Sequence, residues 1–426
     1  MATARVLKRT HPGHATNRAV IGKDTRLSCY MLEQAMASGF LSMGMDVVLT
    51  GPIPTPGVAT LTRSMRADIG VMISASHNPF EDNGIKLFAA DGYKLPDDIE
   101  RQIEEWIDNP ALMTDLPGPG EVGRASRLDD ALGRYIEYVK GSFPRGQTLE
   151  GLKIVLDCAN GAAYKAAPQT LWELEADVIS MGVTPNGQNI NDGVGATATE
   201  ALQARVVAEK ADLGIALDGD GDRLIMVDEK GQRIDGDQLI ALLAIRMKKR
   251  GTLAQDSIVT TVMSNLGLER VLAKSGIKLV RSAVGDRYVV EKLREGGLNL
   301  GGEQSGHIVL SDYGTTGDGL LAALHVLSIL KEQGGLASET LNVFAPVPQL
   351  LKNVRFKAGQ PLQDAEVKGA IVIAEKTLAN DGRLLVRESG TEPLIRIMAE
   401  GDNKTLIQTV VDDLCTVIER VAAKVK

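Results

Sequence analysis

The sequence has few cysteines and no apolar run long enough to cross a bilayer. Its three cysteines, Cys29, Cys158 and Cys415, lie far apart and form no C-x-x-C pair. This spacing excludes a disulfide framework and a zinc site of the C-x-x-C type, and it is typical of a protein of the reducing cytoplasm. The lack of a run of about 20 apolar residues excludes a membrane-spanning helix.

Aromatic residues and positive charge are also scarce. Aromatic side chains make up 4% of the chain, and 47 lysines and arginines stand against 55 aspartates and glutamates, for a formal net charge of -8. Nucleic-acid binding needs a basic surface and often aromatic stacking, so the composition argues against a nucleic-acid partner. An anionic substrate would have to be bound by local arginines and backbone amides.

The pattern of strands and helices predicts four domains, as the length of 426 residues also suggests. Residues 1–141, 142–236 and 237–345 alternate apolar strands with helical patterns, which predicts three similar α/β domains with mixed, mostly parallel sheets. Residues 346–426 form a C-terminal α+β domain in this interpretation, with strands over 369–374, 384–386 and 395–400. Its last helix carries one apolar face, made of Leu414, Val417, Ile418, Val421 and Val425. We expect the four domains to surround a central cleft.

Ser76 is a candidate nucleophile. It lies in the run Ile-Ser-Ala-Ser-His-Asn-Pro at 73–79, directly after a buried-looking strand. Loops beyond the carboxyl ends of strands carry the chemistry of open α/β sheets, and Asn78-Pro79 stops the chain from continuing as strand or helix. The alternative is that Ser76 only caps the next element. His77 is a weaker candidate base, because adjacent residues on an extended chain point to opposite sides.

A second motif, Asp-Gly-Asp-Gly-Asp-Arg at 218–223, follows the apolar strand 213–217. Asp218, Asp220 and Asp222 can converge on one hard cation such as Mg²⁺, because the intervening glycines let the backbone curl. A calcium loop of the EF-hand type is disfavoured, since Arg223 stands where that loop needs glycine and the flanks are strands. A solvated acidic turn is the other alternative. Three aspartates leave the site net acidic, and Arg223 and Lys86 are the residues expected to compensate this charge.

A third motif, Gly-Gly-Glu-Gln-Ser-Gly-His at 301–307, has polar residues at alternating positions. Glu303, Ser305 and His307 would share one side of an extended segment, which suits binding of adjacent sugar hydroxyls. An ordinary glycine-rich turn is the alternative.

A fourth motif, at 387–396, lies between two strands of the last domain. Its hydroxyls, amides and arginines are suited to an anion such as phosphate, and an exposed β-turn is the alternative. The candidate anion ligands are Arg387, Ser389, Gly390, Thr391 and Arg396.

The four motifs, in this order, resemble the active-site loops of the α-D-phosphohexomutase family, and the resemblance runs from about Ala19 to the end of the chain. It implies that Ser76 carries a phosphoryl group, that Asp218, Asp220 and Asp222 bind Mg²⁺ together with the phosphoserine, and that Lys86 moves protons at the attacking hydroxyl. Glu303 and Ser305 would hold sugar hydroxyls, with His307 near the reacting centre. The 387–396 loop would hold the phosphate that does not react. Gly285-Asp286-Arg287-Tyr288 is a weaker point of similarity.

The forms Ser-Ala-Ser-His-Asn-Pro-Phe and Arg-Glu-Ser-Gly-Thr-Glu-Pro are most similar to bacterial family members that act on glucosamine phosphates. The implied reaction interconverts glucosamine 6-phosphate and glucosamine 1-phosphate through a 1,6-bisphosphate, for UDP-N-acetylglucosamine and cell-wall precursor synthesis. The implied cofactors are Mg²⁺ and glucosamine 1,6-bisphosphate or glucose 1,6-bisphosphate as activator. We expect a cytoplasmic isomerase with a small phosphosugar substrate, no nucleic-acid or membrane partner, and a homodimer as a possible state.

One departure from the family pattern leaves alternatives open. Family members begin with a strand and a Gly-Thr-x-Gly-x-Arg-Gly segment whose arginine assists transfer, and nothing in residues 1–17 matches it. This suggests the hypothesis of a chain with weakened catalysis, or of a phosphosugar-binding protein without turnover. A phosphoglucomutase or phosphomannomutase is a further alternative within the same family.

Overall fold

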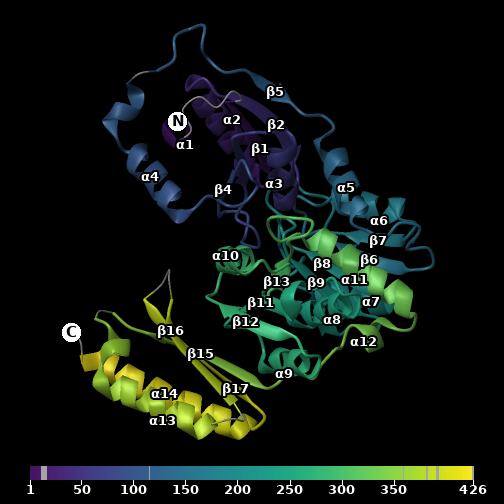
Figure 1. The fold of residues 1–426 in the computed structure, drawn as a ribbon, viewed down its shortest axis with the longest axis vertical. Helices are drawn as coiled ribbons and strands as arrows, with labels where there is room; N and C mark the ends of the chain where they lie inside the picture. Colours follow the sequence, from purple (N-terminus) through teal and green to yellow (C-terminus); the bar gives the residue numbers. More distant parts are fainter. Residues whose placement is uncertain (11–16, 115, 358, 380–381, 390–392, 425–426) are drawn as a thin grey trace.

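The described residues of the chain fold into four β-sheets that follow one another along the sequence (Figure 1). The computed structural model describes all residues except 11–16, 115, 358, 380–381, 390–392 and 425–426. We call the units built on these sheets the first to fourth domains. Within the described residues, no helix is both long enough and apolar enough to span a membrane. The exact boundaries proposed from the sequence stay predictions.

The first three sheets repeat one strand arrangement. Their orders are β4-β3-β1-β2-β5, β10-β9-β8-β6-β7 and β12-β11-β13-β14. In each domain the first strand lies between the second and third strands, parallel to both, and the third strand pairs with the fourth in an antiparallel hairpin. The predicted α/β class with mixed, mostly parallel sheets and a repeated architecture is confirmed.

The strands of these sheets are short and mostly buried. They are β1 (Arg18–Lys23), β2 (Asp46–Pro52), β3 (Ile69–Ile73), β4 (Ile85–Ala89), β5 (Ala125–Arg127), β6 (Lys153–Asp157), β7 (Asp177–Met181), β8 (Leu213–Leu217), β9 (Leu224–Asp228), β10 (Arg233–Ile234), β11 (Ser257–Thr261), β12 (Lys278–Ser282), β13 (Leu300–Gly302) and β14 (Ile308–Leu310). Strands β3, β8 and β9 are buried along their whole length, so their continuous apolar runs are those of strands covered on both faces.

Helices cover the sheets. They are α1 (Ala2–Thr10), α2 (Leu27–Ser42), α3 (Thr55–Ser64), α4 (Asp97–Ile107), α5 (Ala131–Gly141), α6 (Ala166–Glu173), α7 (Glu200–Glu209), α8 (Gly236–Lys249), α9 (Leu266–Lys274), α10 (Asp286–Gly296), α11 (Gly319–Gln333) and α12 (Ala337–Thr340), with the 3₁₀ helices η1 (Pro110–Met113) and η2 (Ala254–Asp256). One continuous apolar core runs through the first three domains, so these domains are held together as a unit.

Helix α1 is an element that the sequence pattern did not predict. Its Ala4 and Val6 side chains are buried in a separate core that also contains Phe40 of α2 and Ile103 of α4. The helix is short, and alternation of small and basic residues hid its apolar side.

The equivalent hairpins bring the chemistry-bearing loops together. Residues 74–84 join β3 to β4, residues 218–223 join β8 to β9, and residues 303–307 join β13 to β14. Arg223 and His307 form an antiparallel bridge between the second and third loops, and the Leu224 N–H donates to the Gly306 carbonyl at 2.9 Å. The repeated architecture therefore places three sequence motifs at one junction.

The fourth domain corrects one sequence prediction. Residues 369–374, predicted as a strand, lie inside helix α13 (Ala365–Leu378). Asp364 caps this helix by accepting the Glu366 N–H at 2.8 Å, and the helix buries Val367 and Leu378 while Ile373 is 67% exposed. A β-branched run can thus be helical where one face alone is needed for burial.

The two other predicted strands and the last helix of the fourth domain are present, and strand β15, which the sequence pattern did not predict, completes the sheet. Its antiparallel sheet has the order β15-β17-β16 and is covered on one face by α13 and α14 (Figure 1). Its remaining elements are β15 (Gln349–Arg355), η3 (Pro361–Gln363), β16 (Gly382–Glu388), β17 (Leu394–Gly401) and α14 (Lys404–Lys424). Helix α14 buries Leu414, Ile418 and Val421 in a core of its own, while Val425 lies outside the described residues.

The loop before α9 ties the third domain to the fourth. The Asn265 side chain donates to the Val347 carbonyl at 2.9 Å, and the Leu266 N–H donates to the buried carboxylate of Glu400 at 3.1 Å. Asp237, on helix α8, fixes this loop, because its carboxylate accepts the Asn265 N–H at 2.7 Å. Burial raises the pKa of Asp237 to about 7.

Asp237→Asn should remove a pH dependence of stability. The folded chain keeps Asp237 protonated up to about pH 7, whereas the unfolded chain loses this proton near about pH 4, so this contribution to wild-type stability is lost as the pH rises between these values. The difference in free energy of unfolding, variant minus wild type, should therefore be larger at about pH 8 than at about pH 5, by on the order of 2 kcal/mol. Urea unfolding at both pH values measures this difference. The exposed Asp129→Asn is the control, and an equal difference at both pH values would contradict the prediction.

Candidate active site

One cleft of about 650 Å³ gathers predicted site residues from the first three domains. Ser76 and Lys86 line it from the first domain, Asp222 and Arg223 from the second. The third domain contributes the three predicted residues of its hairpin loop, Glu303, Ser305 and His307. The structure also places His77, Lys94, Arg233, Asp235 and Asp286 in this lining.

Ser76 is held in an uncommon backbone conformation. Its φ angle is 52°, in the left-handed region that favours glycine. Its hydroxyl donates to Asp218 Oδ2 at 2.6 Å, and the oxygen lies 3.4 Å from His77 Nδ1. Burial, together with the charge of Arg223, lowers the pKa of His77, which favours its neutral form. The candidate nucleophile therefore meets the acidic loop directly.

Asp218, Asp220 and Asp222 form a buried carboxylate cluster. One oxygen from each lies within 4.8 Å of the others. Within the described residues, Asp220 Oδ1 and Asp222 Oδ1 have no hydrogen-bond partner. Burial and the charges of Asp222 and Asp220 raise the pKa of Asp218 well above its usual range. Clustered oxygen ligands with unsatisfied negative charge fit a hard divalent cation such as Mg²⁺.

Lys86 supplies the nearest positive charge to this cluster. Its Nζ lies 2.5 Å from Asp220 Oδ2 and 3.0 Å from Asp222 Oδ2. Burial would lower the pKa of Lys86, but the two carboxylates outweigh burial and raise it. Burial would likewise raise the pKa of Asp222, but Lys86, His307 and Arg223 lower it. Lys86 is therefore a cation when it contacts these aspartates.

His307 is buried between two carboxylates. Its Nε2 lies 3.5 Å from Asp286 Oδ2 and 3.9 Å from Asp222 Oδ2. Asp286 also forms an ion pair with Lys94, and although burial raises the pKa of Asp286, His307 and Lys94 lower it overall. Gly317 packs against the imidazole, since a Cβ there would lie 2.5 Å from Nε2.

Of the candidate sugar ligands Glu303 and Ser305, one has a side-chain hydrogen-bond partner within the described residues and the other has none. Glu303 Oε1 accepts the Gly285 N–H at 3.2 Å, while the buried Ser305 Oγ has no partner within the described residues. The sequence motif that contains Asp286 was a weak signal, whereas the structure places its carboxylate 3.5 Å from His307 Nε2 inside the cleft.

Thr55 is a site residue that the sequence analysis did not name: its N–H donates to the Asp220 carbonyl at 2.9 Å and its hydroxyl donates to Asp220 Oδ2. Only its position one residue after Pro54, at the start of α3, hints at such a role.

The fourth-domain residues are not brought into this cleft: none of its described residues appears in the lining. Arg387 on β16 lies opposite Arg396 on β17. Burial and the charge of Arg396 lower the pKa of Arg387, and both Nε atoms lack a partner among the described residues. Ser389 closes the same strand end through its N–H, which donates to the Leu394 carbonyl at 2.8 Å. Gly390 and Thr391 lie outside the described residues.

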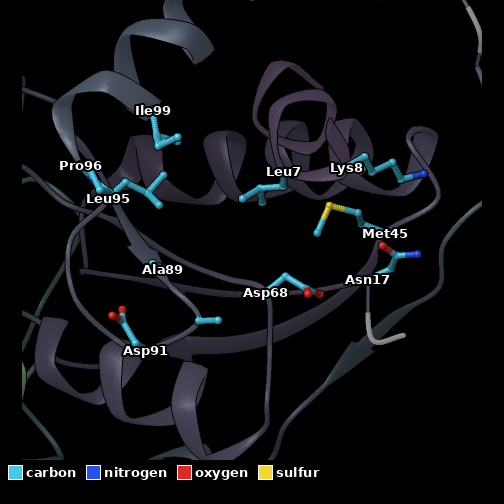
Figure 2. Close-up of a pocket in the computed structure, with 11 residues that line it drawn as sticks. Leu7, Lys8, Asn17, Met45, Asp68, Ala89, Asp91, Leu95, Pro96 and Ile99 are labelled. Carbon is cyan, nitrogen blue, oxygen red and sulfur yellow. The ribbon is translucent and has the colours of Figure 1, made fainter. Parts of the chain in front are cut away.

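A second cavity has a different character. It measures about 390 Å³ and lies between α1, β4 and α4, away from the hairpin loops. Figure 2 shows Leu7, Met45 and Ile99 among its mainly apolar lining, with Lys8 near its rim. It contains no cluster of carboxylates or candidate nucleophile among its lining residues, so the cleft at Ser76 is the better candidate for catalysis.

Family models match all four parts of the chain. Models of the phosphoglucomutase/phosphomannomutase family match as follows: α/β/α domain I at residues 1–112, domain II at 133–231, domain III at 235–347, and the C-terminal domain at 351–417. A crystal structure of a phosphoglucomutase/phosphomannomutase family protein from Burkholderia thailandensis is similar with a TM-score of 0.83 and 25% identity, over 99% of this chain and 93% of the other.

Curated relatives are similar over nearly the full chain. The phosphoglucosamine mutase of Xanthobacter autotrophicus is 59% identical over 423 residues, covering 99% of this chain and 94% of the relative. That of Parvibaculum lavamentivorans is 60% identical over the same coverage. That of Zymomonas mobilis is 61% identical over 406 residues, covering 95% of this chain and 91% of the relative.

Gly317→Ala should displace His307. The added methyl group would overlap the imidazole, so we expect a loss of about 1–3 kcal/mol of stability from overpacking and a looser contact with Asp286. Chemical denaturation measures the stability, and the NMR chemical shifts of the His307 ring report the contact. Gly133→Ala, with open space around its Cβ, is the matched control. Unchanged ring chemical shifts together with unchanged stability would show that the ring is not confined there.

Proposed function

Because the chain belongs to the phosphoglucomutase/phosphomannomutase family, we propose that its cleft carries out phosphoryl transfer on a sugar phosphate, with Ser76 as the nucleophile. The relatives at about 60% identity over nearly the full chain are phosphoglucosamine mutases. The chain is accordingly an isomerase that interconverts glucosamine 6-phosphate and glucosamine 1-phosphate. Neither the glucose or mannose alternative nor the binding-only alternative is favoured by these matches.

The observation that carries the assignment of residues is the 2.6 Å hydrogen bond from Ser76 Oγ to Asp218 Oδ2. It joins the candidate nucleophile of one domain to the candidate metal ligands of the next. Asp218, Asp220 and Asp222 would hold Mg²⁺, which neutralises charge on phosphoryl oxygens when bound. The family depends on magnesium, and the two unpartnered carboxylate oxygens support this ligand set.

The reaction needs two transfers with one serine. Phosphorylated Ser76 gives its phosphoryl group to the 1-hydroxyl of glucosamine 6-phosphate: the bond from phosphorus to serine oxygen breaks, and a bond to the sugar oxygen forms. The 1,6-bisphosphate then turns around and returns its 6-phosphoryl group to Ser76. The His307 imidazole could take up the proton of the attacking hydroxyl, whereas Lys86, as a cation, could give a proton to the departing serine oxygen. Lys86, being cationic, also stabilises charge on the phosphoryl group.

The remaining candidates would bind the substrate. Glu303 and Ser305 would bind sugar hydroxyls, and Arg223 would add positive charge beside the aspartates. The paired Arg387 and Arg396, with Ser389, Gly390 and Thr391, would bind the phosphate that does not react. Glucosamine 1,6-bisphosphate or glucose 1,6-bisphosphate would act as activator by phosphorylating Ser76. We place the enzyme in the cytoplasm, consistent with its three free cysteines, and propose a homodimer as the state to test by light scattering.

Turnover with Ser76→Ala tests the nucleophile. The wild type, with Mg²⁺ and catalytic bisphosphate, should convert glucosamine 6-phosphate in preference to glucose or mannose phosphates, while the variant should lose about a thousandfold or more of kcat. Ser126→Ala, on β5, is the control.

Preferred turnover of glucose or mannose phosphate would reverse the substrate assignment, and absence of turnover on every sugar would favour a binding-only protein.

Asp220→Asn tests the metal ligands. Removing one buried carboxylate charge should weaken Mg²⁺ binding by about a hundredfold or more and lower turnover at limiting metal, because even outer residues of metal sites affect affinity about 10- to 100-fold. Titration calorimetry with Mg²⁺ measures affinity, and circular dichroism checks folding. Asp129→Asn is the exposed control. Wild-type affinity in Asp220→Asn would sink the ligand assignment.

A further inference from the structure

Arg26 is a fully buried arginine that no motif of the sequence singled out. It follows β1 and is held by Asp24, whose carboxylate accepts the Arg26 Nε–H and backbone N–H, both at 2.8 Å. Burying the charge of an arginine without a partner is strongly destabilising, so Arg26 can lie in the interior only because Asp24 pairs with it. Asp24 binds the guanidinium group through Nε, so the two terminal nitrogens at its far end remain available to other acceptors.

That end binds the backbone of the Ser76 loop. One terminal nitrogen of Arg26 donates to the carbonyls of Ser76 at 3.0 Å and Asn78 at 2.9 Å. The other donates to the carbonyls of Asp82, at 3.2 Å, and Pro79. A single planar group thus fixes four carbonyls of the loop that carries the nucleophile.

Asn191 of the second domain binds two of the same carbonyls. Its Nδ2 donates to the Ser76 and Asn78 carbonyls, each at 2.9 Å. Asn191 has a φ angle of 59°, and its own N–H donates to the Ala159 carbonyl at 2.9 Å. Gly219 of the acidic loop completes this contact, because a Cβ there would lie 2.4 Å from the Ser76 carbonyl oxygen.

These contacts act on the one residue of the loop whose conformation is unfavourable. Ser76 has a left-handed backbone, and such a conformation persists in a non-glycine residue when its surroundings hold it. Turning the peptide after Ser76 would break donors from two domains at once. A relaxation of the Ser76 φ angle would swing Cβ and so move Oγ away from Asp218, and small misplacements of reacting groups cost large factors in rate.

We propose that Arg26 and Asn191 are positioning residues that hold Ser76 in its left-handed conformation, so that Oγ stays against the acidic loop during both transfers. This role rests on the proposed function of Ser76. Each domain contributes one donor, so the alignment of nucleophile and metal ligands depends on the first and second domains being correctly packed.

Asn191 offers the cleaner test, because Arg26 is part of the interior and its loss endangers folding. Asn191→Ala removes both donors, and Asn191→Asp faces the two carbonyls with an oxygen that cannot donate. The matched control is Asn189→Ala: Asn189 lies in the same loop, and its amide donates to the Thr184 carbonyl at 3.1 Å instead of to the Ser76 loop.

We expect kcat to fall about ten- to a hundredfold in Asn191→Ala and further in Asn191→Asp, with KM for glucosamine 6-phosphate within about twofold of wild type. Melting temperature should change no more than in Asn189→Ala, which should keep wild-type kcat. Intact-protein mass, followed after mixing with 1,6-bisphosphate, should show slower phosphorylation of Ser76 in both Asn191 variants.

Two results would overturn the role. If Ser76 is phosphorylated as fast in Asn191→Ala as in the wild type, the positioning role is overturned but the proposed function is not. A wild-type chain that takes up no phosphoryl group at Ser76 would overturn the proposed function and this role with it. Arg26→Lys, which keeps a positive charge for Asp24 but cannot span four carbonyls, should lower kcat in the same way, and its effect should not add to that of Asn191→Ala.

Discussion

The concentration of negative charge at Asp218, Asp220 and Asp222 is the constraint on which the rest of this structure depends. Three carboxylates buried within 4.8 Å of one another repel, and they require positive partners from elsewhere in the chain. The Lys86 cation reaches them from the first domain, and the His307 ring of the third domain lies 3.9 Å from Asp222 Oδ2. The repulsion among the three carboxylates is therefore offset only when the domains are packed together, and the shared apolar core of these domains provides that packing.

A repeated hairpin solves the problem of bringing distant loops to one place. In each of the first three domains the loop between the third and fourth strands carries one of the candidate motifs, so one architectural position is used three times. The junction of these loops is tight, with backbone contact between Leu224 and Gly306. The proposed chemistry would thereby be divided among domains: the candidate nucleophile comes from one, the candidate metal ligands from the next, and the candidate sugar ligands from the third.

Sequence reasoning succeeded where a motif is local and failed where a role depends on long-range contact. Strand alternation predicted the α/β class, and the position of Ser76 after β3 predicted its exposure to the cleft. The helical nature of 369–374 could not be read from a β-branched run, because the burial of one face decides it. Asn191 meets the Ser76 carbonyl across 115 residues of chain, a relation that no spacing rule reveals.

The fourth domain has a core of its own and can therefore unfold separately from the rest of the molecule. Because α13, α14 and the sheet β15-β17-β16 pack on one another, this domain can lose its order while the other three keep theirs. A chain in that state would retain the serine and the aspartates yet lack Arg387 and Arg396. If Arg387 and Arg396 bind the phosphate that does not react, as proposed, heat or truncation at this end would weaken the binding of the sugar phosphate while leaving the candidate nucleophile and metal ligands in place.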